Sequence, residues 1–123
     1  MAIILIADDD ASCRMMLRAA LQNLGHDVVE ASNGKEACAM LAQGAPSLVL
    51  LDVLMPEKDG IETIMEIRAT HPNLVVIAMS GGGRFPGGDY LKIIGMLGAN
   101  EILRKPFGLD HLNTVVAKVL TPY

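Results

Sequence analysis

Five short apolar runs, each followed by a stretch of helical periodicity, constrain the fold of this 123-residue chain more than any other feature. A strand buried on both faces reads as an unbroken apolar run, and strands that alternate with helices form βαβ units in a parallel sheet. Right-handed crossovers then give a doubly wound α/β fold with five strands and five helices. The runs are Ile3–Ala7, Asp27–Ala31, Leu48–Asp52, Leu74–Met79 and Ile102–Leu103.

The segments between the runs repeat apolar residues at helical spacing. Asp10 or Ser12 can cap the first of these helices, and Gly25 can end it. Asn33, with Glu36 three residues later, resembles a capping box at the start of the second. Three further helices are expected from about Gly60, with Ile61, Ile64, Met65 and Arg68 on one face, around Tyr90–Leu97, and around Leu109–Val119.

Composition narrows the class of protein. Hydrophobic residues make up 51% of the chain and aromatic residues only 3%, which indicates one domain with an aliphatic core. The formal net charge of −4, without any basic stripe, argues against direct nucleic-acid binding. No apolar run reaches the ~18 residues of a membrane helix, and the first lacks the basic start of a signal peptide. Cys13 and Cys38 are typical of reduced, structural thiols, so we expect a cytoplasmic protein.

Polar residues gather where the predicted strands end. In a parallel sheet all carboxyl ends lie at one edge, and ligands of open α/β sheets bind in the crevice there. This arrangement places Asp8 and Asp9, Asp52, Ser80 and Lys105 around one crevice. Asp52 could instead be an ordinary turn residue or helix cap, which is the common fate of an aspartate at such a position.

The chemistry of these five side chains indicates phosphoryl transfer. Converging carboxylates repel each other unless a divalent cation lies between them, and all-oxygen ligands suit Mg²⁺ or Mn²⁺. Lys105 can contact a phosphoryl oxygen, and Ser80 offers a hydroxyl donor. Asp52 would then be the nucleophile that accepts the phosphoryl group. The alternative is a sheet whose ends merely carry acids, with Lys105 in a plain salt bridge.

Five ordered motifs resemble those of response-regulator receiver domains, the phospho-acceptor domains of two-component systems. The resemblance covers essentially all of residues 1–123, so we expect one receiver domain and no output domain. The motifs are Ile3–Asp10, Leu50–Pro56 followed by Asp59-Gly60, Ser80 after an apolar strand, Gly98-Ala99, and Lys105-Pro106-Phe107.

The resemblance implies a flavodoxin-like sheet of strand order 2-1-3-4-5. It also implies that a histidine kinase or a phosphotransfer protein donates a phosphoryl group from phosphohistidine to Asp52. Such a domain signals through protein contacts and catalyses only its own phosphorylation and dephosphorylation. The resemblance further implies a downstream protein partner and a monomer, or a weak phosphorylation-dependent dimer that forms through the fourth and fifth helices.

The same resemblance assigns the metal ligands and the switch residues. Asp9 and Asp52 would coordinate Mg²⁺ directly, the Leu54 carbonyl would add a ligand, and Asp8 would act through a metal-bound water. For the switch, Lys105 would pair with the phosphoryl group and Ser80 would move toward it. The Lys105–Pro106 peptide bond is expected to be cis.

Three features depart from the family pattern. Ile102 stands where receivers usually carry an aromatic switch residue; isoleucine can change rotamer but cannot project a ring onto a partner. The segment Gly81–Gly88 is longer and richer in glycine than usual. Leu54 and Gly82 occupy the two positions that flank the attacking water in receivers, which leaves the lifetime of the phosphoryl group open.

Other classes share parts of this pattern. A phosphatase of the haloacid-dehalogenase type also uses an aspartyl nucleophile, but it needs a second carboxylate two residues later, where this chain has Leu54. A flavodoxin-like cofactor binder would stack aromatic residues on its ligand, and only Phe85 and Tyr90 lie near the crevice. A degenerate receiver that only binds proteins would not need Asp9, Asp52, Ser80 and Lys105.

Overall fold

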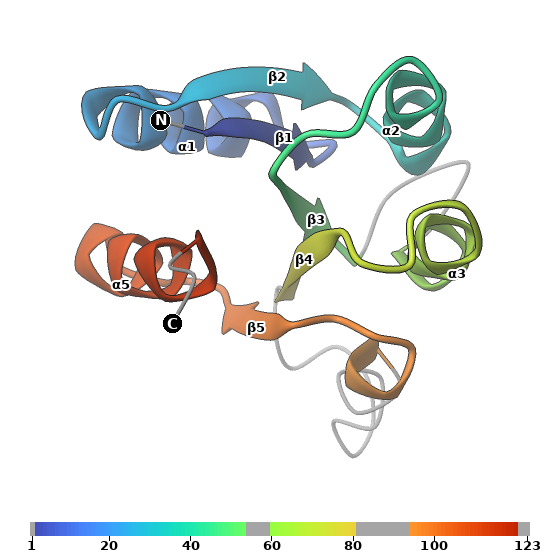
Figure 1. Ribbon diagram of the computed structural model, residues 1–123. Helices are drawn as coiled ribbons and strands as arrows, with labels where there is room; N and C mark the ends of the chain where they lie inside the picture. The colour runs from blue at the N-terminus through green and yellow to red at the C-terminus, as the bar shows by residue number, and fades with distance from the viewer. Residues whose placement is uncertain (1, 54–59, 81–93, 121–123) are drawn as a thin grey trace.

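A computed structural model describes residues 2–53, 60–80 and 94–120 of the chain. Its centre is a single sheet of five parallel strands in the order β2-β1-β3-β4-β5 (Figure 1). This confirms the predicted doubly wound α/β class and the strand order 2-1-3-4-5. The strands are β1 (Ile3–Ala7), β2 (Asp27–Ala31), β3 (Leu48–Asp52), β4 (Val75–Ser80) and β5 (Glu101–Arg104).

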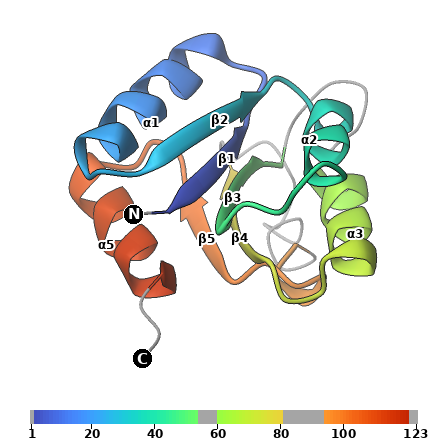
Figure 2. The same ribbon diagram turned by 45° about the horizontal axis from the view of Figure 1, so that its top comes forward.

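Helices cover both faces of the sheet. One face carries α1 (Ala11–Asn23) and α5 (Leu109–Leu120), and the other carries α2 (Gly34–Leu41) and α3 (Gly60–Thr70) (Figures 1 and 2). Residues 94–96 are also helical, but most of the helix expected around residues 90–97 lies outside the described residues. None of the helices in the described ranges is both long and apolar enough to cross a lipid bilayer.

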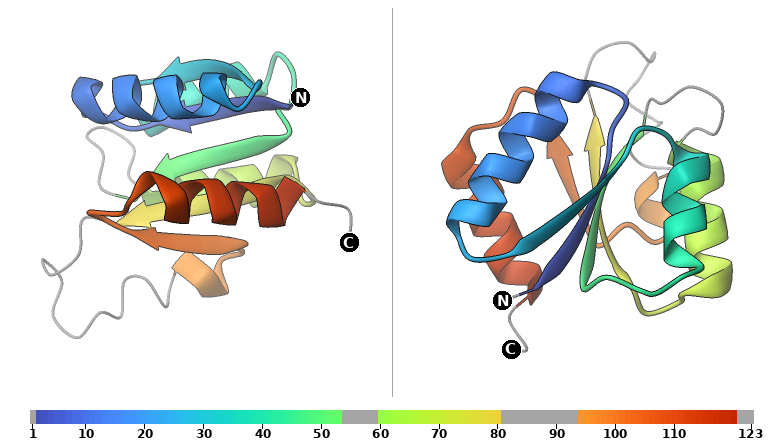
Figure 3. Two further views of the ribbon diagram at one scale, coloured as in Figure 1. Left: turned by 90° about the vertical axis from the view of Figure 1, so that its left-hand side faces the viewer. Right: turned by 90° about the horizontal axis from the view of Figure 1, so that it is seen from above.

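Alternating side chains of the strands build two aliphatic cores, one on each face. Within β1, Ile4 and Ile6 pack toward α1 and α5, whereas Leu5 and Ala7 pack toward α2 and α3. All five residues of β3 are buried, which explains why this central strand reads as a continuous apolar run. The right view of Figure 3 shows α1 and α5 on one side of the sheet and α2 and α3 on the other.

Side-chain caps fix the starts of the first two helices. Asp10 is the N-cap of α1, because its carboxylate accepts hydrogen bonds from the backbone N–H groups of Ser12 and Cys13. Asn33 caps α2 by accepting from the N–H of Glu36 at 2.8 Å. The Glu36 carboxylate does not complete the usual capping box, since it accepts from the backbone N–H and the hydroxyl of Ser32 instead.

The predicted buried face of α3 is partly wrong. Ile64 is fully buried as expected, but Met65 is 55% exposed, and Thr63 and Ile67 complete the buried side. Helical spacing from Ile64 fits two overlapping faces, one with Ile61 and Met65 and the other with Thr63 and Ile67, and the sequence analysis chose the first. Contact with the sheet selects the face that contains the smaller Thr63.

Arg68, near the end of α3, holds the amino ends of β4 and β5 together. Its guanidinium donates to the carbonyl oxygens of Leu74 at 2.6 Å and Gly98 at 2.6 Å, and to Asn100 Oδ1 at 3.0 Å. Asn100 Oδ1 also accepts from the N–H of Val76. A planar fork of five donors suits such a set of acceptors, which a lysine could not match.

Gly60 allows α3 to start against the end of β3. A Cβ atom at this position would lie 2.4 Å from the Cα of Val53, which is closer than carbon atoms approach without displacing the backbone. The Gly60 N–H also donates to the Val53 carbonyl oxygen at 3.0 Å. The helix therefore meets the segment that follows Asp52 at a point where only a hydrogen atom fits.

We predict that Gly60→Ala lowers the free energy of unfolding by about 3 kcal/mol, because the added methyl must displace backbone atoms of Val53. Urea unfolding followed by circular dichroism measures this loss. Gly44→Ala is the matched control, since a Cβ there meets no atom within 4 Å, and its free energy of unfolding should change by no more than about 1 kcal/mol. Equal effects of the two substitutions would contradict this account of Gly60.

Candidate functional site

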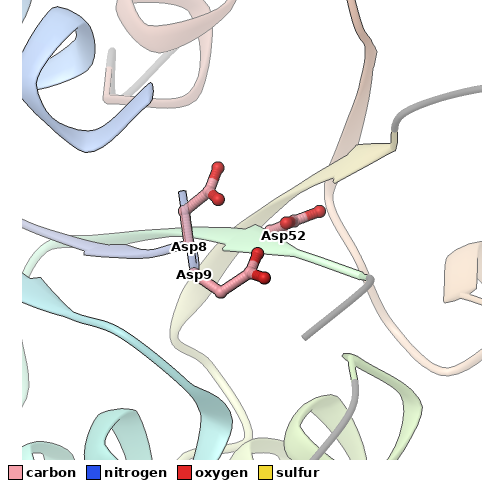
Figure 4. Close-up of side chains that lie close together, drawn as sticks. All are labelled: Asp8, Asp9 and Asp52. Atoms are coloured by element: carbon pink, nitrogen blue, oxygen red, sulfur yellow. The ribbon is translucent and has the colours of Figure 1, made fainter. Parts of the chain in front are cut away.

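Three carboxylates meet at the carboxyl edge of the sheet. The register pairs Ala7 of β1 with Leu51 of β3, so Asp8 and Asp52 follow these two residues on neighbouring strands. Ligand oxygens of Asp8, Asp9 and Asp52 lie within 4.8 Å of one another. Figure 4 shows the three side chains gathered beside the ends of β1 and β3. The structure therefore brings these three predicted residues together.

Asp8 is fully buried, and two donors hold its carboxylate. Lys105 Nζ donates to Oδ2 at 2.8 Å, and the Asp10 N–H donates to Oδ1 at 2.9 Å. Burial raises the pKa of the Asp8 carboxyl, but the hydrogen bonds from Lys105, Asp10 and Cys13, together with the positive charge of Lys105, outweigh this effect. The pKa of Asp8 therefore lies below its ordinary value, and the group is ionised at neutral pH.

Lys105 stands between two carboxylates. Its Nζ lies 2.8 Å from Asp8 Oδ2 and 3.7 Å from Asp52 Oδ2. Burial alone would lower the pKa of Lys105, but the hydrogen bond to Asp8 and the nearby charge of Asp52 raise it above its ordinary value. The Lys105–Pro106 peptide bond is cis, the isomer that the resemblance implies.

Of the remaining predicted residues, the structure describes Ser80 and Ile102 but not Leu54. Ser80 ends β4, is only 4% exposed, and accepts a hydrogen bond from the Lys105 N–H through its carbonyl oxygen at 2.6 Å. Ile102, in the middle of β5, packs partly buried against the core below α2 and α3. Leu54 and the segment Gly81–Gly88 lie outside the described residues, as do Phe85 and Tyr90.

The donor set fits a hard divalent cation. Asp9 is exposed, whereas Asp8 and Asp52 are buried, so one side of the cluster is open to solvent. Mg²⁺ characteristically binds one or two carboxylates and keeps several waters, and Mn²⁺ accepts the same oxygen ligands. Asp9 and Asp52 can supply the direct ligands, while Lys105 already neutralises much of the Asp8 charge.

Two residues near the cluster were missed from the sequence. Burial and the neighbouring Asp8 carboxylate raise the pKa of the Cys13 thiol to about 12, so this thiol stays protonated. Arg14 Nη1 donates to the Asp8 carbonyl oxygen at 2.6 Å. The sequence held one indication for Arg14: a residue one turn after the Asp10 cap lies beside the loop that precedes the helix.

Comparison with known proteins identifies the class. The family "Response regulator receiver domain" matches residues 4–117. The DNA-binding transcriptional regulator NtrC of Azospirillum brasilense is 37% identical over 119 residues, which cover 97% of this chain and 24% of that protein. The transcriptional regulatory protein CpxR of Klebsiella pneumoniae is 37% identical over 118 residues, covering 95% of this chain and 48% of that protein. The chain thus spans a quarter to a half of these relatives.

Solved structures agree with the sequence relatives. Chemotaxis protein CheY4 of Vibrio cholerae superposes with a TM-score of 0.88 at 28% identity, covering 98% of this chain and 99% of that one. Response regulator protein TrrA of Thermotoga maritima, in complex with Mg²⁺ and BeF, gives a TM-score of 0.86 at 31% identity, covering 98% and 100%. The fold and site define a signalling domain of two-component systems. The chain belongs to the response regulator receiver domain family.

We predict that Lys105→Met lowers the free energy of unfolding by about 3 kcal/mol near neutral pH in metal-free buffer, because it leaves the buried Asp8 carboxylate without its cation. The sign of the pH dependence follows from Asp8. Its lowered pKa stabilises the native protein above the ordinary value of 3.8, and this contribution is lost as pH falls through the folded value. Without Lys105, burial is the largest remaining influence on the pKa of Asp8, and we expect it to outweigh the hydrogen bonds from Asp10 and Cys13 and to raise the pKa, so the variant should lose stability as pH increases above 3.8.

The deficit of Lys105→Met relative to the original chain should therefore be larger at about pH 7 than at about pH 5, as measured by urea unfolding. Lys118→Met is the control: Lys118 pairs with Glu101 at 3.0 Å but is 66% exposed, so its loss should cost about 0.5 kcal/mol or less. A deficit that does not change with pH would contradict the expected rise in the pKa of Asp8 when Lys105 is removed.

Proposed function

We propose that this chain is a Mg²⁺-dependent phospho-acceptor, in which Asp52 receives a phosphoryl group from the phosphohistidine of a histidine kinase or a phosphotransfer protein. The observation that carries the proposal is the position of Asp52. Its carboxylate ends the central strand, lies 3.7 Å from Lys105 Nζ, and belongs to a group of three carboxylates. Membership of the receiver family supports the same reading.

The transfer exchanges one bond for another. A carboxylate oxygen of Asp52 attacks phosphorus, the bond from phosphorus to the donor histidine nitrogen breaks, and that nitrogen leaves with the electron pair. The transferred group carries its charge on its equatorial oxygens, so catalysis depends mainly on position and charge neutralisation. Lys105 is close enough to shift from Asp52 to one of these oxygens, and the Ser80 hydroxyl is proposed to donate to another.

A bound Mg²⁺ would supply positive charge for the phosphoryl oxygens and would relieve the repulsion among the three carboxylates. Asp9 and Asp52 are proposed as direct ligands, with the Leu54 carbonyl as a third and Asp8 acting through water. Receiver domains generally bind Mg²⁺ at an acidic pocket, and TrrA of Thermotoga maritima carries Mg²⁺ and BeF in its solved structure. The clustered carboxylates of this chain are consistent with that arrangement.

We further propose that phosphorylation alters contacts with a downstream protein partner. Ser80 and Ile102 lie on neighbouring strands, so a movement at the site can reach the surface of β5. We propose that the chain is a monomer, or a weak dimer that forms on phosphorylation, and that it acts in the cytoplasm.

We predict that incubation with acetyl phosphate and Mg²⁺ adds the mass of one phosphoryl group, as measured by intact-protein mass spectrometry. Asp52→Asn should abolish the gain, because an amide cannot form the acyl phosphate, and a chelator should do the same. Asp110→Asn is the matched control: Asp110 is an exposed aspartate in the first turn of α5, so its loss should leave the gain unchanged.

A mass gain that survives Asp52→Asn would place the acceptor elsewhere. If no gain occurs with acetyl phosphate, formation of a beryllofluoride complex, followed by ¹⁹F NMR, becomes the deciding measurement. A complex that requires Asp52 and Mg²⁺ supports a receiver that accepts phosphoryl groups only from its own kinase. Failure of both reactions would leave a domain that acts only by binding proteins.

A further inference from the structure

Arg14 touches the backbone of the acidic cluster rather than its side chains. Its Nη1 donates to the Asp8 carbonyl oxygen at 2.6 Å, and the Arg14 backbone N–H donates to the Asp10 carbonyl oxygen at 3.0 Å. Arg14 therefore contacts the backbone at both ends of the turn from Asp8 to Asp10, the second contact being the first hydrogen bond of α1. The Asp8 N–H is fixed as well, because it donates to the Ala31 carbonyl oxygen at the end of β2.

Glu30 holds the Arg14 side chain in this position. Arg14 Nε lies 3.0 Å from Glu30 Oε1, so one edge of the guanidinium is bound to β2 while Nη1 reaches Asp8. Arg18, one turn later on α1, donates to the other oxygen of Glu30. Arg18 shares the ion-pair network, yet among the hydrogen bonds of the described residues it has none to the acidic turn. It is therefore a natural control for Arg14.

The hydrogen bond to Asp8 bears on the direction of Asp9. The Asp8 carbonyl belongs to the peptide plane that joins Asp8 to Asp9, and a fixed carbonyl fixes that plane. The Asp8 carboxylate is anchored by Lys105 and Asp10, but Asp9 is exposed. An exposed side chain takes its direction mainly from the backbone that carries it, so the peptide plane matters most for Asp9.

We propose that Arg14 is a positioning residue for metal binding: held by Glu30, its guanidinium fixes the Asp8–Asp9 peptide and thereby aims the Asp9 carboxylate at the cation. This inference rests on the function proposed above, since it gives Arg14 a part in Mg²⁺ binding. Groups that orient metal ligands from outside the coordination sphere typically change metal affinity 10- to 100-fold when they are removed.

A purely electrostatic role of Arg14 makes the opposite prediction. Removing a positive charge near three carboxylates would strengthen the attraction for Mg²⁺, so Arg14→Gln would bind the metal more tightly. Positioning predicts weaker binding instead. Arg14→Lys keeps the charge but cannot hold Glu30 and the Asp8 carbonyl with one rigid fork, so it should weaken binding too, by a smaller factor.

The test compares Mg²⁺ affinity in four variants, measured by titration of the metal-free protein and followed by the backbone amide signals in ¹H–¹⁵N NMR spectra. We expect Arg14→Gln to weaken binding roughly tenfold, with Arg14→Lys and Glu30→Gln in between. Arg18→Gln removes the same charge from the same network and should stay within about twofold of the original chain. Thermal unfolding of each variant confirms that it is folded.

The metal-free spectra give a second readout that does not depend on the loaded protein. The Asp9 and Asp10 amide signals should shift in Arg14→Gln and stay in place in Arg18→Gln, because only the first variant releases the Asp8–Asp9 peptide. If Arg14→Gln does not fold, Arg14→Lys and Glu30→Gln decide by the same comparison with Arg18→Gln.

The outcomes separate this inference from the proposed function. If the original chain and Arg18→Gln bind Mg²⁺ and Arg14→Gln binds it equally well or more tightly, the positioning role is overturned while the phospho-acceptor site stands. If the original chain binds no Mg²⁺, the proposed function fails and the inference fails with it. Equal weakening in Arg14→Gln and Arg18→Gln would assign the effect to the ion-pair network as a whole and would also overturn the positioning role.

Discussion

The repulsion among three carboxylates at one sheet edge is the constraint on which this site depends. A parallel sheet places all its carboxyl ends together, so Asp8, Asp9 and Asp52 are close because of topology. The compensating cation, Lys105, follows the last strand and stands 97 residues from Asp8 along the chain. The negative charge of the site is therefore partly compensated only when β5 has joined the sheet, which couples completion of the fold to assembly of the site.

This compensation is incomplete, and the negative charge that remains is what the proposed cation would neutralise. Lys105 lies nearer to Asp8 than to Asp52, at 2.8 Å against 3.7 Å. The better-paired carboxylate is the fully buried Asp8, whereas Asp9 faces solvent. One lysine cannot neutralise three acids, so the cluster keeps negative charge on the side that a hydrated divalent ion can reach. The arrangement sacrifices some stability for that charge, as functional sites commonly do.

Most of the fold could be predicted from sequence because buried strands appear as apolar runs and buried helix faces repeat apolar residues at helical spacing. Every residue of β3 is buried, and that strand stood out as an apolar run. The cluster of Asp8, Asp9 and Asp52 followed from the rule that strand ends share an edge. What the pattern could not give was set by contacts between elements. Met65 is exposed and Thr63 is buried because the packing of α3 on the sheet selects the buried face. Spacing could place Arg14 near the turn, but it could not identify the Asp8 carbonyl oxygen as its partner.

The amino and carboxyl ends of the strands are held by different kinds of contact, and this difference bears on how the site can respond. At the amino ends of β4 and β5, Arg68 binds backbone carbonyl oxygens, which carry no net charge and do not belong to the site. At the carboxyl edge, the contacts of Lys105 are with ionised groups, whose balance would change with the proposed binding of a cation or a phosphoryl group. A change of charge at Asp52 therefore acts on the end of β5 that carries Lys105, while Arg68 keeps the opposite end fixed. Movement should concentrate at the carboxyl edge, because the contacts of Lys105 are with the carboxylates of the site, whereas those of Arg68 are not.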